Sequence, residues 1–62
     1  MVRFDRRGES GNIFFILGAA YAELIKLEKL NEAREMNSRV MSSGSYEEAL
    51  KIIGEYVELK EV

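Results

Sequence analysis

Cysteine and histidine are both absent from this 62-residue sequence. Their absence excludes disulfides and the usual zinc sites, which often stabilise chains too short to bury a large core. A calcium site built from carboxylates needs clustered acidic and amide side chains, whereas Asp5 is the only Asp and the three Asn are well separated. We therefore expect no metal and no other cofactor, and stability that comes from regular packing together with self-association.

The same absences argue against an enzyme. General acid–base chemistry would have to use carboxylates, lysine or tyrosine, for example Glu23 or Glu47 beside a tyrosine. Each of these residues has a simpler role on a solvated helix face or in a helix cap. A single domain of residues 1–62 is also too short to enclose a substrate pocket. We predict a protein without catalytic residues.

A strong charge of either sign and a long hydrophobic run are missing as well. The formal net charge of −2 gives no general attraction for nucleic acid or anionic lipid. The longest apolar run, Ile13 to Ala22, lies inside the chain without a cleavage context and is too short to span a bilayer. We expect a cytoplasmic protein without membrane contact.

The hydrophobic pattern predicts a strand at each end of the chain. Val2 to Arg7 alternates with a period of two, which is typical of a strand with one half-buried face. Gly8 to Asn12 then forms a turn, in which Ser10 or Asn12 can cap the following helix. Val57 to Val62 alternates again and predicts the second strand.

Between the strands the pattern predicts three helices. Ile13 to about Leu30 is the first, and a shorter amphipathic segment ends near Met41, unless the two form one long bent helix from Asn12. Gly44 is expected to end the second helix in a left-handed conformation, and Ser45 to Glu48 is a capping box that starts the third. The predicted core faces are Ile13, Ile16, Leu17, Ala20, Leu24 and Leu27, with Phe14, Tyr21 and Ile25 at the margin; Ala33, Met36, Val40 and Met41; and Tyr46, Ala49, Leu50, Ile53 and Val57.

This order predicts an α+β fold, a small β-α-α-α-β domain whose terminal strands pair with each other in either direction. A lone two-stranded ribbon is marginal in water and leaves two open edges, so we expect dimerisation to complete the domain. The back of the first helix supports a homodimer, because a stripe of one large and three small residues would let a second helix approach closely. These candidate self-association residues are Phe15, Gly18, Ala19 and Ala22. The alternative is that Phe15 packs beneath the second or third helix of its own chain.

One segment has a composition that suits an anion. Its candidate residues are Arg6, Arg7, Ser10, Gly11 and Asn12. A glycine-containing turn before a helix exposes N–H groups and the positive end of the helix dipole, which can hold a phosphate or an acidic side chain. The turn lacks the lysine of a P-loop, and Glu9 places a negative charge in it. The alternative is a capped turn whose arginines pair with Glu58 or Glu61 of the neighbouring strand.

Two further functional hypotheses follow from these residues. Arg3, Arg6 and Arg7 cluster near the amino terminus, and ribbon-helix-helix repressors are small dimers that read DNA with paired amino-terminal strands. The acidic balance and the acid-rich stretch from Glu55 to Glu61 argue against such a nucleic-acid-binding regulator. The other hypothesis is a binder of a small phosphorylated ligand near Arg6 to Asn12.

Two stretches carry a family resemblance: Ser10 to Gly18, and Ser43 to Leu50 continuing to Glu55-Tyr56-Val57. With them the chain resembles a family of short, mostly uncharacterised proteins of bacteriophages and other mobile elements, in which a Gly-Asn step opens an apolar helix and a Gly-x-Tyr-x-x-x-Leu helix ends in a strand. The resemblance implies no site residues. It implies a non-catalytic protein that binds a host protein in the host cytoplasm, and inhibitors of bacterial defence are a prominent class of such proteins. Protein–protein binding is therefore the leading hypothesis.

Overall fold

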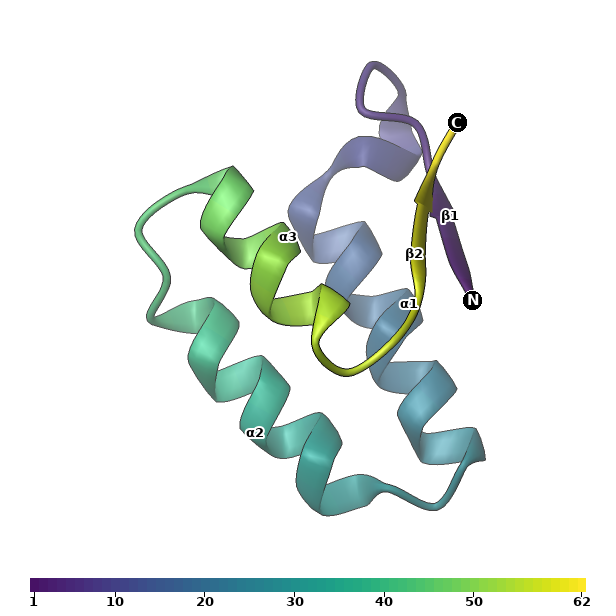
Figure 1. Ribbon diagram of the computed structural model, residues 1–62, viewed down its shortest axis with the longest axis vertical. Helices are drawn as coiled ribbons and strands as arrows, with labels where there is room; N and C mark the ends of the chain where they lie inside the picture. The colour runs from purple at the N-terminus through teal and green to yellow at the C-terminus, as the bar shows by residue number, and fades with distance from the viewer.

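The computed structural model describes residues 1–62 and contains six elements of secondary structure. In chain order they are strand β1 (Val2–Phe4), the short 3-10 helix η1 (Glu9–Gly11), helices α1 (Ile13–Lys26), α2 (Leu30–Met41) and α3 (Tyr46–Gly54), and strand β2 (Leu59–Glu61). Helices α1 and α2 form a hairpin, α3 packs across it, and the strands lie on the side of α3 away from α2 (Figure 1). The predicted β-α-α-α-β order is confirmed.

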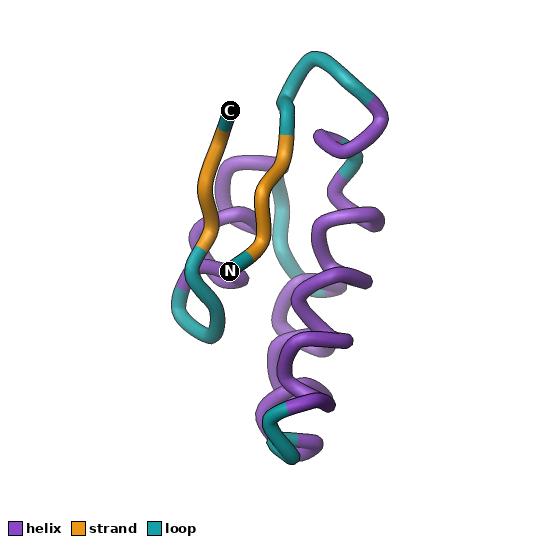
Figure 2. Tube along the Cα trace, turned by 90° about the vertical axis from the view of Figure 1, so that its right-hand side faces the viewer, coloured by secondary structure: helices purple, strands orange, loops and turns teal.

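The two terminal strands pair with each other in parallel. Val2 lies opposite Leu59, and Phe4 lies opposite Glu61. The Val2 N–H donates to the carbonyl of Glu58 at 2.8 Å, which extends the ladder by one residue. Both strands run in the same direction in Figure 2. The three helices therefore act as the crossover connection that a parallel pair requires.

Both strands are shorter than predicted. β1 ends at Phe4 because Asp5 begins a turn, in which its carbonyl accepts a hydrogen bond from the Gly8 N–H at 3.0 Å. Arg6 and Arg7 therefore lie in that turn and do not continue the alternation of Val2 to Arg7. β2 begins at Leu59, two residues after Val57, because the Val57 N–H still bonds the Ile53 carbonyl at the end of α3.

Helix α1 ends at Lys26, four residues before the predicted boundary, and α2 is a separate helix. Glu28 has a left-handed backbone with φ of 60°. The Lys29 N–H bonds the Leu24 carbonyl at 2.8 Å, and the Glu28 N–H bonds the Ile25 carbonyl at 2.9 Å. This is the Schellman pattern, in which Glu28 occupies the position usually taken by glycine. The sequence did not signal this turn because it has no glycine there.

The connection between α2 and α3 follows the predicted capping box but not the predicted glycine. Ser45 Oγ accepts a hydrogen bond from the Glu48 N–H at 3.1 Å, and the Glu48 carboxylate accepts one from the Gly44 N–H at 2.6 Å. The glutamate thus reaches one residue further back than in the standard box. The prediction of a left-handed Gly44 is wrong, because no glycine has a positive φ. The Ser43 hydroxyl instead donates to the last turn of α2, at the Val40 carbonyl.

The core is a single cluster of 14 buried side chains, all of them apolar. It comprises Val2, Phe4, Ile16, Leu17, Ala20, Leu24, Ala33, Met36, Val40, Ala49, Leu50, Ile52, Ile53 and Val57. Most of the predicted helix faces are present in it. β1 contributes both of its inward residues, so the terminal ribbon closes the core over α1 and α3.

Candidate binding surface

The predicted anion site is a turn that its own hydrogen bonds hold closed. Ser10 Oγ accepts a hydrogen bond from the Asp5 N–H at 2.8 Å. Asn12 Oδ1 accepts one from the Phe14 N–H at 2.8 Å and so caps α1. Gly11 is buried where the chain folds back against the backbone of Asp5. These three predicted residues therefore shape the turn. The side-chain oxygens of Ser10 and Asn12 already accept hydrogen bonds from the backbone.

Arg6 is held between carboxylates of the same chain. Its Nε lies 3.2 Å from Glu61 Oε2, and its Nη1 bonds the carboxylate of Glu47. The guanidinium carbon also lies 5.6 Å from the centre of the Tyr46 ring. The hydrogen bond that Arg6 donates to Glu47 raises the pKa of Arg6, so this group stays charged and paired. This is the pairing that the alternative interpretation predicted with Glu61, while no such pair forms with Glu58.

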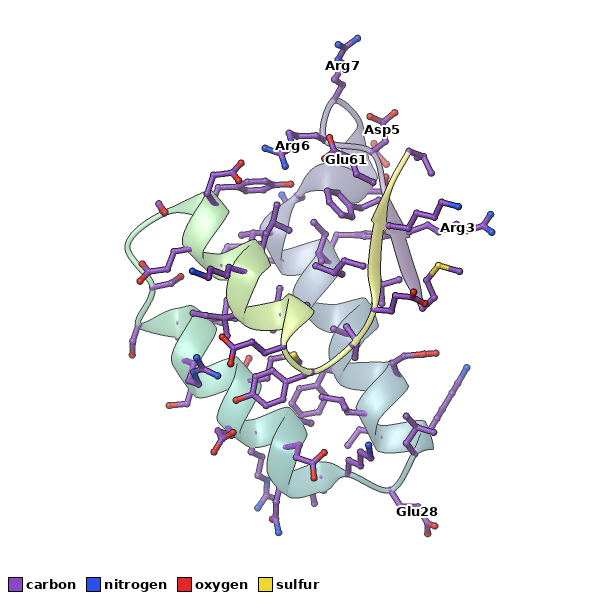
Figure 3. The ribbon with its side chains drawn as sticks, viewed as in Figure 1. Arg3, Asp5, Arg6, Arg7, Glu28 and Glu61 are labelled. Carbon is purple, nitrogen blue, oxygen red and sulfur yellow. The ribbon has the colours of Figure 1, made fainter.

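Arg7 is separated from this cluster. It projects from the tip of the turn and points away from Arg6 (Figure 3). The hollow beside the turn is lined by Asp5 and Glu61 as well as by the two arginines, so its charges balance. The structure does not bring the five candidate anion-binding residues together as a cradle with an excess of positive charge.

The predicted self-association residues lie on the surface of α1. Phe15 is 55% exposed, Gly18 and Ala22 are exposed, and Ala19 is half-buried. The alternative, in which Phe15 packs under the second or third helix of its own chain, is wrong. A Cβ placed on Gly18 would meet no atom within 4 Å. The stripe is thus open to a second helix.

Several large side chains assigned to the helix core faces or their margins are also exposed. Phe14 and Ile25 are 65% and 43% exposed, and Leu27, on the turn after α1, is 60% exposed. On α2, Met41 is 57% exposed, so its predicted place in the core is wrong. For Phe14 and Ile25 the reason is that the other elements pack only against the side of α1 that carries its buried residues.

A sequence signal for this exposure exists. From Ile13 to Lys26, α1 has only two charged residues, Glu23 and Lys26. Glu23 is half-buried, with a carboxylate oxygen 3.7 Å from the amino group of Met1. A helix that is apolar on all sides is normally buried on all sides. In this fold one side of it has no cover.

We call this surface the outer face of the α1–α2 hairpin. It consists of Phe14, Phe15, Gly18, Ala19, Ala22 and Ile25 from α1 and of Leu30 and Met41 from the two ends of α2. The spacing of the α1 residues places them on one side of the helix, opposite its buried residues. At one end, Phe14 and Met41 line a groove of about 360 Å³, together with the buried Val40 and the loop before α3.

The opposite end of α3 is joined to α2 by polar contacts. Arg39 donates to the Glu55 carboxylate at 2.8 and 3.1 Å and to the Tyr56 hydroxyl at 3.0 Å. The Tyr56 hydroxyl donates to Glu35 at 2.5 Å. The hydrogen bond from Arg39 lowers the pKa of Glu55, and the one to Glu35 raises the pKa of Tyr56. These groups satisfy one another and link α2 to α3.

Two of the remaining candidates have structural partners. Of the residues considered for acid–base chemistry, Glu47 bonds Arg6, and the Tyr46 hydroxyl donates to the Gly11 carbonyl. β1 pairs within its own chain, unlike the amino-terminal strands of ribbon-helix-helix repressors, which pair between two copies. Nowhere do three acidic side chains gather as metal ligands.

None of the helices is long and apolar enough to cross a membrane. The fold is that of a small α+β domain, and its most distinctive surface is an uncovered apolar helix face. No family model, no curated protein and no solved structure matches the chain. The functional argument therefore rests on this surface.

Proposed function

We propose that this chain is a non-catalytic protein-binding domain that acts as a homodimer. The observation that carries the proposal is the outer face of the α1–α2 hairpin. Its five large apolar side chains are between 43% and 65% exposed. Together they leave about 400–500 Å² of apolar surface in water, which is the size of patch that often marks a functional contact.

The target that we propose is a protein of a bacterial host, which the domain inhibits or otherwise modulates in the host cytoplasm. The resemblance of Ser10 to Gly18 and of Ser43 to Val57 to phage and mobile-element proteins supports this choice. The pairing of Arg6 with Glu47 and Glu61 also favours a protein over nucleic acid, because it neutralises one of the three arginines near the amino terminus.

Affinity capture from a bacterial lysate, followed by mass spectrometry, tests this function. We expect one host protein to be retained in near-stoichiometric amount by the intact chain. A matched bait with Phe15→Glu should lose that protein, because the face must be intact for the homodimer that binds the target, whereas a bait with Glu58→Gln should retain it. Recovery of nothing but the bait, combined with DNA binding at low salt or thermal stabilisation by a nucleotide, would replace this function with one of the two other hypotheses.

A further inference from the structure

We propose that a second copy of this chain covers the outer face, with the two α1 helices packed antiparallel and crossing at Gly18 and Ala22. This inference rests on the proposed homodimer and gives it a surface and an orientation. It starts from α1, which is apolar on the side away from the core as well as on the core side. In a twofold dimer one uncovered face covers another like it, so a single surface meets the needs of both copies.

The area of the face agrees with this occupant. The five large side chains supply about 400–500 Å² per copy, and two copies therefore bury about 800–1,000 Å². The small residues between them, Gly18, Ala19 and Ala22, add exposed backbone and methyl groups. The sum lies below the roughly 1,200 Å² of standard interfaces and within the range of weak, transient ones. The area therefore suits a weak dimer.

The centre of the face permits close helix packing. Gly18 and Ala22 are four residues apart and therefore lie one above the other on the same side of α1. Around Gly18 there is open space of at least 4 Å. Phe15 and Ile25 flank this flat centre, one toward each end of the helix. Two such helices can approach at the centre while the large side chains of one contact the end of the other.

The charges at the ends of α1 favour the antiparallel orientation. Lys26 is the exposed charged residue in the last turn, and Glu9 lies exposed just before the first turn. A parallel pair would place the Lys26 side chains of the two copies next to each other and would align the two helix dipoles in the same direction. An antiparallel pair brings each Lys26 toward the amino-terminal end of the other α1, where Glu9 lies, and opposes the dipoles.

The open edge of β2 is a less suitable surface for a second copy. The strand has only three residues, Leu59 to Glu61, two of which are charged. Short edge strands with charged side chains are features by which proteins prevent edge-to-edge pairing. Helix α1 is much longer, with 14 residues, and its exposed charged residue, Lys26, lies only in the last turn.

The first experiment measures the mass in solution by light scattering and sedimentation over a concentration series. We expect the wild-type chain to be a dimer. Gly18→Gln should raise the dissociation constant of the dimer about tenfold or more, because a side chain at the crossing separates the helices. Gly54→Gln is the matched control: it is also a helical glycine, its Cβ would lie 4.0 Å from the nearest side chain, and it belongs to α3. It should leave the dissociation constant unchanged.

Circular dichroism and urea unfolding of both variants show whether they fold. Because Gly18 has no neighbour in its own chain, Gly18→Gln should fold at least as stably as the wild type. A folded Gly18→Gln that dimerises as tightly as the wild type would overturn the proposal, and so would a wild-type chain that is monomeric up to about 500 µM.

The second experiment tests the orientation. The chain has no cysteine, so introduced thiols report on a single contact. In an antiparallel pair that crosses between Gly18 and Ala22, Phe15 of one copy lies near Ile25 of the other. Oxidation of a mixture of Phe15→Cys and Ile25→Cys proteins should give the mixed disulfide in excess over either self-linked product. Predominant self-linking of each protein would show parallel packing and overturn this orientation.

The two levels of the proposal fail in different ways. If the wild-type chain is monomeric, and Phe15→Glu abolishes capture of a lysate protein, then the outer face binds another protein. That result overturns the second copy as occupant and leaves the protein-binding function standing. If the dimer forms as described and no partner is captured, the dimer stands and the proposed function fails.

Discussion

At the scale of single residues, two positions depend on the backbone more than on their side chains. Gly11 is buried beneath the turn after β1, where a Cβ would overlap the Asp5 carbonyl and come within 2.7 Å of Arg6 Cα. Gly8, three residues earlier in the same turn, has open space, with its nearest neighbours in the Asp5 side chain at 3.8 Å or more. Only one of these two glycines is required by the packing.

We therefore predict that Gly11→Ala destabilises the fold by about 1–3 kcal/mol, because backbone atoms must move to admit the methyl group. Gly8→Ala should be neutral or stabilise by up to about 1 kcal/mol, since it reduces the entropy of the unfolded chain. Urea unfolding of the two variants and the wild type measures the difference. Equal stabilities would show that the turn does not have the described packing.

Glu28 is the other such residue, since it is the only non-glycine residue with a positive φ. A left-handed conformation costs a residue with a Cβ roughly 1–2 kcal/mol, a cost that glycine avoids. We predict that Glu28→Gly raises the free energy of unfolding by about 0.5–1 kcal/mol. Arg34→Gly, at an exposed position inside α2, should lower it by about 1 kcal/mol. A loss of stability in Glu28→Gly would contradict the left-handed turn.

At the scale of elements, the contact between α2 and α3 combines an apolar interior with an exposed polar cluster. Arg39 joins Glu55 and Tyr56, and its guanidinium carbon lies 5.6 Å from the centre of the Tyr56 ring. The periodicity of each helix predicts the apolar contact. The polar one depends on the angle at which the helices cross, because Arg39 and Glu55 belong to different elements.

This cluster predicts a pH dependence. The folded chain holds the pKa of Glu55 below its ordinary value, mainly through the hydrogen bond from Arg39. A lowered pKa in the folded state contributes stability above the pKa of the unfolded chain, and that stability is lost as the pH falls through the folded value. We expect Glu55→Gln to flatten part of the decline in stability between neutral pH and about pH 3.

The control for this measurement is Glu58→Gln, because Glu58 is exposed and its side chain has no ion pair. Thermal unfolding monitored at a series of pH values compares both variants with the wild type. Identical acid profiles for Glu55→Gln and Glu58→Gln would show that the pair with Arg39 adds nothing to stability in solution.

At the scale of the whole molecule, the parallel ribbon ties the two ends of the chain over the core. β1 contributes Phe4, which is 4% exposed, whereas Phe15 of α1 is 55% exposed. The two phenylalanines therefore have opposite roles in a chain that contains only three. One belongs to the core and the other to the outer face.

We predict that Phe4→Ala lowers the free energy of unfolding by about 3–4 kcal/mol, a large part of the total for a domain of this size. Phe15→Ala should cost less than about 1 kcal/mol in a monomeric state, since its ring makes few contacts that folding creates. Unfolding at low protein concentration separates this effect from dimerisation. A large loss in Phe15→Ala under those conditions would place that ring in the core and contradict the outer face.

Sequence periodicity by itself determined the order of the elements and most of the core, because a period of two or of 3.6 records which side of a segment is apolar. The capping box also determined the start of α3, since the contacts of Ser45 with Glu48 are local. Periodicity placed α1 correctly but could not say which part of its apolar circumference lacks a cover.

Only the tertiary structure decided that question, along with the parallel direction of the strands and the partners of Arg6. Each of these depends on residues distant in sequence that the crossing of three helices brings together. The shortened strands and the early end of α1 have a local origin instead, because turn hydrogen bonds at Asp5, Glu28 and Val57 end these elements where the hydrophobic pattern would continue them. Phe14, Ile25 and Met41 lie on the surface on which the proposed function rests, and not in the expected core or its margin, because no other element of the fold covers them.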